Sequence, residues 1–180
     1  MEILKTDNKK DEKFLRQRTE KFDFGKFTKK EIGELVRKMK AAMRTAHGIG
    51  LSANQIGLPW RVFVAEVPSK DGGLKFYAVF NPKIEKVGGE TLLLEEGCLS
   101  VPGVFGAHAR KERIVLSGFD MRGKPLKIKA WGLLAHVFQH ETDHLDGKLF
   151  VDGAKELHKV ESVARASEEA RRKRYGIEPI

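Results

Sequence analysis

The run His140-Glu141-Thr142-Asp143-His144 combines residue types and a spacing that can bind a metal ion and activate water. On a helix, two histidines four residues apart are displaced by about 40° around the axis and about 6 Å along it, so both imidazoles can bind one ion. Glu141 is rotated by about 100° from His140, which places its carboxylate beside the open face of the ion, where it can take a proton from water. The pattern therefore predicts a metal-dependent hydrolase.

His136 adds a third histidine one helical turn before the other two. Eight residues of helix span about 12 Å, which is too far for one ion with metal bonds of about 2.1 Å, so one ion can use only the first pair or the second. Only the second pair has a glutamate directly after its first histidine. We assign His140 and His144 as ligands and expect His136 to line the pocket or the surface.

A hydrolytic metal site needs a third protein ligand and an open position for water. The only cysteine, Cys98, is a candidate, and the alternative interpretation is a small buried hydrophobic residue. A zinc endopeptidase would instead take a downstream ligand, for which His158 is available. His158 lies beyond the helix stop at Asp146-Gly147 and lacks the Gly-x-x-His continuation of one such class, which disfavours this alternative.

Two further segments accompany the histidine run. Glu96-Gly97-Cys98-Leu99-Ser100 precedes residues 139–147, and Gly48-Ile49-Gly50-Leu51-Ser52-Ala53-Asn54-Gln55 precedes both. In this order and with this spacing, the three segments resemble the motifs of the peptide deformylase family. The resemblance covers most of the chain and is weakest over residues 1–27, where the usual proline is missing. Ser52 stands where the family commonly has alanine, and we expect this exchange to matter little.

The resemblance implies an enzyme that removes the N-formyl group from the starting methionine of newly made polypeptides and releases formate. It also implies that one divalent metal ion is held by Cys98, His140 and His144. The resemblance favours Fe²⁺ in the cell. Because a thiolate with two imidazoles also accommodates Zn²⁺, Ni²⁺ or Co²⁺, any of these would be unsurprising in purified protein.

The remaining site residues also follow from the resemblance. Glu141 is the acid/base, and the Gln55 side chain with the Leu99 backbone N–H stabilises the charge that develops on the formyl oxygen. Arg110 is expected to pair with Glu96 or Asp143 and to orient the site from outside it. The residues implied around the substrate are Ile49, Gly50, Leu94, Glu96, Gly97, Leu133, His136 and Val137.

Length and composition predict one folded domain over residues 1–180, because 41% hydrophobic and 33% charged residues lie in the globular range. No apolar run approaches the roughly 20 residues that cross a bilayer, and the N-terminus lacks a secretion signal. A single cysteine excludes an internal disulfide, so we expect a cytoplasmic protein, and we expect a monomer.

The net charge of +9 favours encounters with polyanions such as RNA. The densest basic patch is Arg171-Arg172-Lys173-Arg174, and with the predicted C-terminal helix it is a candidate contact to the ribosome. The alternative interpretation is a solvated basic surface. A second alternative function, an RNA-binding or ribosome-binding module with a structural metal, is disfavoured by Glu141 beside the ion.

An α+β fold must position these residues, with mostly antiparallel sheet around a central helix that carries the histidines, an N-terminal helix and a C-terminal helix. A capping box at Thr28 and Glu31 begins an amphipathic helix that ends before Gly48, and a phenylalanine-anchored arm covers residues 1–27. The predicted strands are Arg61–Val67, Phe76–Phe80, Ile84–Val87, Ile114–Phe119 and Leu126–Trp131. The predicted later helices are Leu133–Leu145 and Ala154–Arg174.

Overall fold

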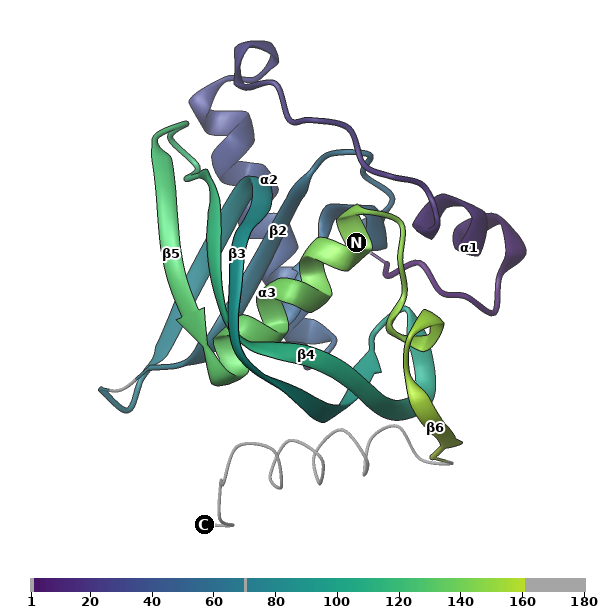
Figure 1. Cartoon of the computed structure of the whole chain (residues 1–180). Helices are drawn as coiled ribbons and strands as arrows, with labels where there is room; N and C mark the ends of the chain where they lie inside the picture. Colours follow the sequence, from purple (N-terminus) through teal and green to yellow (C-terminus); the bar gives the residue numbers. More distant parts are fainter. Residues whose placement is uncertain (1, 70, 161–180) are drawn as a thin grey trace.

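A computed structural model describes residues 2–69 and 71–160 of the chain (Figure 1). Within these residues the fold is α+β, and a six-stranded antiparallel sheet has the order β1-β2-β3-β4-β5, with β6 paired to β4. The helices are α1 Lys9–Leu15, α2 Lys29–Thr45 and α3 Gly132–Leu145. The strands are β1 Gly50–Ser52, β2 Val62–Pro68, β3 Leu74–Cys98, β4 Val101–Phe119, β5 Pro125–Trp131 and β6 Lys155–Lys159. Short 3-10 turns are η1 Phe24–Lys26, η2 Ala53–Ile56 and η3 Phe150–Asp152.

Two long strands shape the sheet around helix α3. β3 and β4 pair along most of their 25 and 19 residues, and their ladder shifts register at several points. Such irregularities bend a strand pair and increase its twist. The first half of β3 pairs with β2, whereas its second half forms with β4 an arm that passes beneath α3 (Figure 1). This arm brings Glu96 and Cys98 to the helix.

Two separate apolar clusters pack α2 and α3 against the sheet. One buried cluster joins α2 to β1 and β2 and includes Met39, Met43 and Leu51. A second cluster joins α3 to the sheet and includes Phe138, Phe63 and Leu116. Nine of the 14 residues of α3 are buried, so the helix is held against protein along most of its surface and can position side chains rigidly.

The boundaries of both main helices confirm the sequence predictions. Thr28 accepts a hydrogen bond from the Glu31 backbone N–H, and the Glu31 carboxylate accepts from the Thr28 N–H, which is the predicted capping box. Helix α3 ends before Asp146, and the following Gly147 has a φ of 75°. A β-carbon on Gly147 would lie 2.4 Å from the Arg16 carbonyl oxygen, so glycine is required at this stop.

The predicted strands Phe76–Phe80 and Ile84–Val87 are confirmed as strand, but they belong to the single strand β3, because the bulged ladder with β4 continues through the glycines at 88 and 89. One predicted element is wrong over its described residues. The predicted helix Ala154–Arg174 begins instead as strand β6, whose residues pair with the edge of β4. The rest of that predicted helix, including the basic patch at 171–174, lies outside the described residues.

The N-terminal arm packs against the rest of the fold, and it contains helix α1. The Leu4 N–H donates to the Gln55 carbonyl at 2.8 Å, and the Thr6 N–H donates to the Ser100 carbonyl at 2.9 Å. Phe22 is buried among other aromatic rings. The arm therefore ties together the two segments that carry Gln55 and Cys98.

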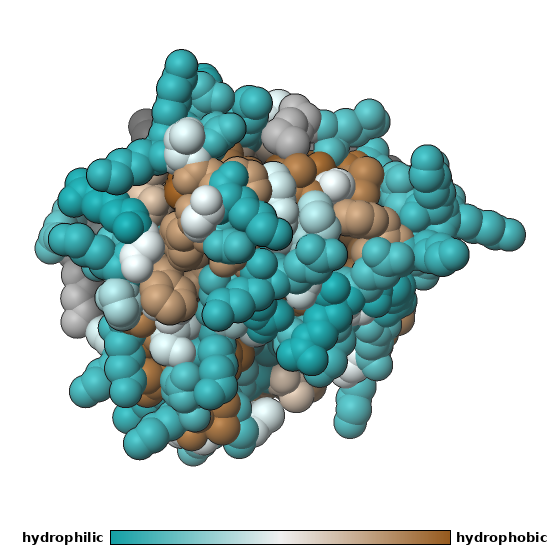
Figure 2. Space-filling model, turned by 90° about the horizontal axis from the view of Figure 1, so that it is seen from above, coloured by the Kyte–Doolittle hydropathy of each residue, from teal (hydrophilic) through white to brown (hydrophobic). Residues whose placement is uncertain are grey.

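Hydrophilic side chains dominate the face seen in Figure 2, with hydrophobic side chains gathered in patches between them. Among the described residues, the helices are too short or too polar to cross a membrane.

Glu66 forms an ion-pair cluster between β2 and α2 that should stabilise the fold above acidic pH. Its carboxylate accepts hydrogen bonds from Arg44 at 2.7 and 2.8 Å and lies 3.2 Å from Lys40. Hydrogen bonds from Arg44 lower the pKa of Glu66, so its stabilisation is present above the pKa of the unfolded chain, about 4.3, and is lost as the pH falls below it. Glu66→Gln should lower the free energy of unfolding by about 1 kcal/mol at pH 7 in urea titrations. If Glu66→Gln lowered the free energy of unfolding by the same amount at pH 3 as at pH 7, this account would be contradicted.

Candidate metal centre and adjoining pocket

Three side chains from two elements converge on one point. Helix α3 presents His140 and His144 one turn apart, and the end of β3 presents Cys98. The Nε2 atom of His144 lies 3.1 Å from the Nε2 atom of His140 and 3.1 Å from the Cys98 Sγ atom. All three ligand atoms lie within 4.8 Å of one another. Two imidazoles and a thiolate suit a divalent transition metal, so the residues present fit such an ion.

Glu96 contacts the ligand His140 at the ring nitrogen that faces away from the other two ligands. Its buried carboxylate lies 2.8 Å from Nδ1 of His140 and 2.7 Å from Nε2 of His136, and it accepts hydrogen bonds from Arg110 at 2.6 and 3.0 Å. Burial alone would raise the pKa of Glu96, but the hydrogen bonds from these three side chains hold it well below its usual range. Arg110 also donates to Asp143, so it pairs with both predicted partners.

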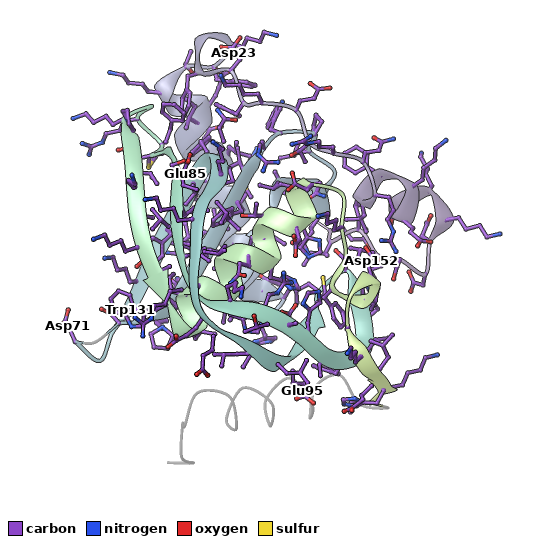
Figure 3. The ribbon with its side chains drawn as sticks, in the orientation of Figure 1. Asp23, Asp71, Glu85, Glu95, Trp131 and Asp152 are labelled. Atoms are coloured by element: carbon purple, nitrogen blue, oxygen red, sulfur yellow. The ribbon has the colours of Figure 1, made fainter. Side chains whose placement is uncertain are left out.

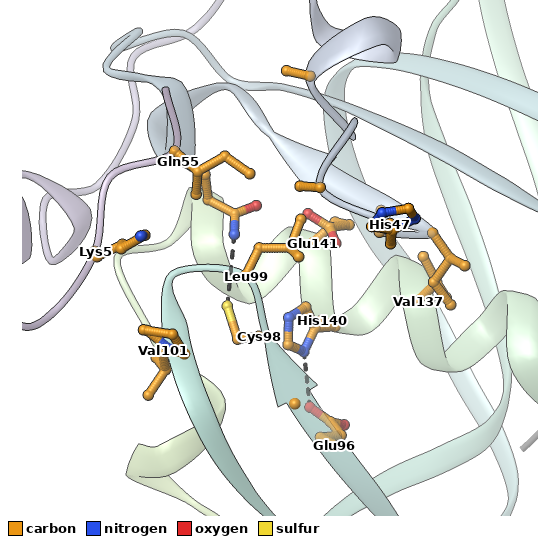
Figure 4. Close-up of a pocket in the computed structure, with 18 of the residues that line it drawn as sticks. Lys5, His47, Gln55, Glu96, Cys98, Leu99, Val101, Val137, His140 and Glu141 are labelled. Atoms are coloured by element: carbon orange, nitrogen blue, oxygen red, sulfur yellow. Dashed lines mark hydrogen bonds and ion pairs between the residues drawn. The ribbon is translucent and has the colours of Figure 1, made fainter. Parts of the chain in front are cut away.

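Glu96 was predicted as a substrate contact, and the structure adds a contact with a ligand histidine. The residue lies at the cavity wall, but its carboxylate points at His140, as Figure 4 shows. Fixing Nδ1 in this way turns the opposite nitrogen, Nε2, toward the other two ligands. Burial, together with the charge of His140, lowers the pKa of His144 well below its usual range. Burial also opposes protonation of His140, but its contacts with Cys98 and Glu96 raise its pKa.

Glu141 lies beside the ligand cluster in a buried position (Figure 4). Burial raises the pKa of Glu141 to about 6, against the opposing effects of His140 and Ser52. A β-carbon on Gly50 would lie 2.2 Å from Oε1 of Glu141, so any side chain at this position would displace the carboxylate. Gly50 was implied as a substrate contact, and its packing against Glu141 gives a second reason for a glycine here.

Gln55 lies on the opposite side of the cluster from Glu96. Its Oε1 atom accepts a hydrogen bond from the Ser52 backbone N–H at 2.9 Å, and its Nε2 atom donates to Ser100 Oγ at 3.1 Å. The same Nε2 atom lies 3.6 Å from Cys98 Sγ (Figure 4). Leu99 follows the cysteine at the rim of the same cavity. The predicted amide donor and the residue of the predicted backbone donor are thus brought beside the ligands.

A cavity of about 860 Å³ adjoins the ligand cluster. Most predicted substrate-contact residues line this cavity. These residues are Ile49, Gly50, Glu96, Gly97, Leu133, His136 and Val137. His136 was expected to line either the pocket or the surface, and it lines the pocket. Leu94 is not among the lining residues, because it lies farther along the β3–β4 arm, opposite His108.

Sequence reasoning missed several residues of the cavity wall. Val101 and Phe105 line it because β4 folds back on β3 directly after the cysteine, with Gly97 opposite Phe105. The short interval between the two strands was a signal that could have placed them. Lys5 and Lys38 also line the cavity, but they come from the N-terminal arm and α2, and nothing in their local sequence indicates it.

His158, the downstream ligand candidate, lies outside the cluster. It is on β6, where its ring stacks on Phe105 and its Nε2 atom lies 3.6 Å from Glu95. Glu95 lies below the β3–β4 arm in Figure 3, and its side chain is 55% exposed, whereas the adjacent Glu96 is buried. The geometry therefore favours the upstream cysteine as the third ligand.

Comparison with known proteins gives a consistent result. A family model described as polypeptide deformylase matches residues 1–160. Peptide deformylase 2 of Streptomyces coelicolor is 38% identical over 148 residues, which cover 81% of this chain and 80% of that protein. A probable peptide deformylase from Synechococcus phage S-SSM7 has a crystal structure with a TM-score of 0.76 and 39% identity, covering 85% of this chain and 99% of that one. The structure of a peptide deformylase from Acinetobacter baumannii with bound Met-Ala-Ser has a TM-score of 0.77 and 26% identity. The match covers 85% of this chain and 97% of that one.

Proposed function

Because this chain belongs to the peptide deformylase family, we propose that Cys98, His140 and His144 bind its catalytic metal ion. The enzyme removes the N-formyl group from the N-terminal formyl-methionine of newly made polypeptides and releases formate. One observation carries the proposed site: the three ligand atoms converge beside a buried carboxylate at the wall of a single cavity.

Each step of the hydrolysis has a candidate residue. A divalent cation held by Cys98, His140 and His144 would supply Lewis acidity and lower the pKa of water. Glu141 would take a proton from the attacking water and donate one to the departing amine. Its raised pKa of about 6 suits a group that must both accept and donate near neutral pH. The Gln55 amide and the Leu99 backbone N–H donate to the formyl oxygen as its negative charge develops.

The cavity can receive the start of a polypeptide. Ile49, Leu133 and Val137 form an apolar wall suited to the methionine side chain. Strand β1 is the last strand of the described sheet on its side, so its outer edge is available to an extended peptide, which would add as another strand. The bound Met-Ala-Ser in the Acinetobacter baumannii enzyme supports a peptide that begins with methionine.

The other properties remain part of the proposal. Iron is proposed as the metal in the cell, with zinc, nickel or cobalt in purified protein, since the ligand set accommodates all four. The site of action is the cytoplasm, where nascent chains are made, and the protein acts as a monomer. Ribosome contact through the basic surface, including the patch at 171–174, extends the proposal to residues outside the described part.

Formate release from a formyl-Met tripeptide tests the function. Metal-loaded protein should release formate from this peptide and no acetate from the matching acetyl-Met tripeptide. Glu141→Ala and Cys98→Ser should abolish most of the release. Absence of formate with fully metal-loaded native protein would refute the proposal, and cleavage of an internal peptide bond, detected by mass spectrometry, would identify an endopeptidase instead.

Metal removal should affect both activity and stability. A ligand that binds only the folded state stabilises it by about 2.7 kcal/mol at one hundred times its dissociation constant. Chelation should therefore abolish formate release and lower the thermal midpoint, and added Zn²⁺ or Fe²⁺ should restore both. In His144→Ala, adding the chelator should not change the thermal midpoint. If the chelator lowers the midpoint of this variant as much as that of the native protein, the metal binds elsewhere.

A further inference from the structure

Ser52 contacts the proposed acid/base directly, which contradicts the expectation from the sequence that its exchange with the family's alanine matters little. Its hydroxyl oxygen lies 2.6 Å from Oε2 of Glu141 and 2.9 Å from the backbone carbonyl oxygen of the same residue. Ser52 is completely buried and Glu141 nearly so. One hydroxyl group thus lies within hydrogen-bond distance of two acceptors on Glu141, and its single proton is shared between them or donated to one of them.

The contact with the carboxylate is the stronger of the two. A separation of 2.6 Å falls in the range of a charge-assisted O–H···O⁻ hydrogen bond. Within residues 2–69 and 71–160, Ser52 supplies the sole hydrogen bond from a side chain to this carboxylate. Such a bond is worth more in a buried site than in water, because no solvent competes for the acceptor.

Packing restricts the carboxylate from its other side. A β-carbon on Gly50 would lie 2.2 Å from Oε1 and 3.0 Å from Cγ of Glu141, so the Gly50 backbone already packs closely on that side chain. Glu141 is therefore held between a hydroxyl donor and a backbone wall. A glutamate side chain has several freely rotating bonds, and fixing it in one orientation requires both kinds of contact.

Ser52 holds the proposed oxyanion donor as well, but through a different atom. Its backbone N–H donates to Oε1 of Gln55, which leaves the Nε2 atom of that amide facing Cys98. Replacement of Ser52 by alanine removes the hydroxyl group and keeps the backbone N–H. The substitution therefore disturbs Glu141 and spares Gln55.

We propose that Ser52 is a positioning residue, whose hydroxyl group holds the Glu141 carboxylate in the orientation that takes a proton from water. The proposal rests on the proposed function, in which Glu141 is the acid/base. Substrate binding does not require this orientation, so loss of the hydroxyl group should change kcat and leave KM unchanged.

The variant Ser52→Ala should lower kcat about ten-fold in the zinc-loaded enzyme, with native KM and one metal ion per chain. Thr142→Val is the matched control, because it removes another buried hydroxyl group from the same region. The Thr142 hydroxyl donates to the Phe138 carbonyl at 2.7 Å and does not contact the Glu141 carboxylate. This control should keep kcat within two-fold of native. A kcat within two-fold of native for Ser52→Ala, or an equal fall in both variants, would overturn the proposal.

A double-mutant cycle with Glu141→Ala gives a readout that does not depend on turnover. Ser52→Ala should shift the unfolding equilibrium constant of the zinc-loaded protein about ten-fold less in the Glu141→Ala background than in the native one. Equal shifts in both backgrounds would show that Ser52 does not act through Glu141. Because this cycle measures unfolding, its failure is distinguishable from failure of the deformylase assignment, which the native protein tests by formate release.

Discussion

Replacing Glu141 with glutamine is expected to lower kcat for formate release about 10³-fold while one metal ion per chain is retained. Glutamine has nearly the same size and can still accept the hydrogen bond from Ser52, which lies 2.6 Å away in the native protein. It cannot take a proton from water or pass one to the departing amine. General acid/base catalysis by a positioned side chain typically contributes 10²- to 10⁴-fold, and one carboxylate here serves both transfers.

Steady-state kinetics with a formyl-Met tripeptide would measure the loss, with metal content determined on the same samples. Glu34→Gln on helix α2 removes a carboxylate that does not line the cavity, and it should leave kcat within two-fold of native. KM of Glu141→Gln should stay near the native value, because binding of the formyl-methionine does not need the proton transfer. A loss of activity that parallels a loss of metal would show instead that Glu141 maintains the ligand cluster.

The parts of the site that the sequence predicts are those with local geometry. His140, Glu141 and His144 lie within five residues on one helix, so helical periodicity alone places their side chains relative to one another. The stop at Gly147 and the capping box at Thr28 are equally local, and both agree with the structure. Cys98 and Gln55 join the site through tertiary contacts, so residue chemistry alone offered Cys98 only as a candidate ligand, and the resemblance was needed to assign Cys98 and to include Gln55.

Contacts between distant segments explain what was missed. Ser52 and Glu141 are 89 residues apart, and their hydrogen bond depends on how β1 packs on α3. Strand β6 contains charged residues that suit an exposed helix, but its backbone pairs with the open edge of β4. Leu94 lies on the same strand as Glu96 but does not line the cavity, because it lies farther along the β3–β4 arm. Local propensity cannot reveal such pairings.

Glu96 is the second position where a large effect is expected, because its carboxylate satisfies several buried donors at once. It is 1% exposed, and Arg110, which pairs with both of its oxygens, is 5% exposed. The same two oxygens face His136 and His140. Removing one partner of a buried ion pair typically costs 3–5 kcal/mol, since the remaining charge keeps its desolvation penalty without compensation.

Glu96→Gln should therefore lower the free energy of unfolding by about 3 kcal/mol and raise the metal dissociation constant about 10- to 100-fold. The amide places an N–H group where an oxygen now accepts from Arg110 or a histidine, so at least one donor loses its partner. His140 would then no longer be fixed through Nδ1, and its Nε2 atom would sample orientations away from Cys98 and His144. Unlike Glu141→Gln, this variant should recover much of its kcat when metal is supplied in excess.

Glu95→Gln is the natural comparison, because Glu95 adjoins Glu96 on the same strand and its side chain is 55% exposed on the outer face. Denaturant titrations and competition with a chelator would measure stability and metal affinity for both variants. If Glu96 acts only as a structural ion pair, Glu96→Gln will lose stability with native metal affinity. If it orients the ligand histidine, as the 2.8 Å contact with His140 indicates, both quantities will fall together.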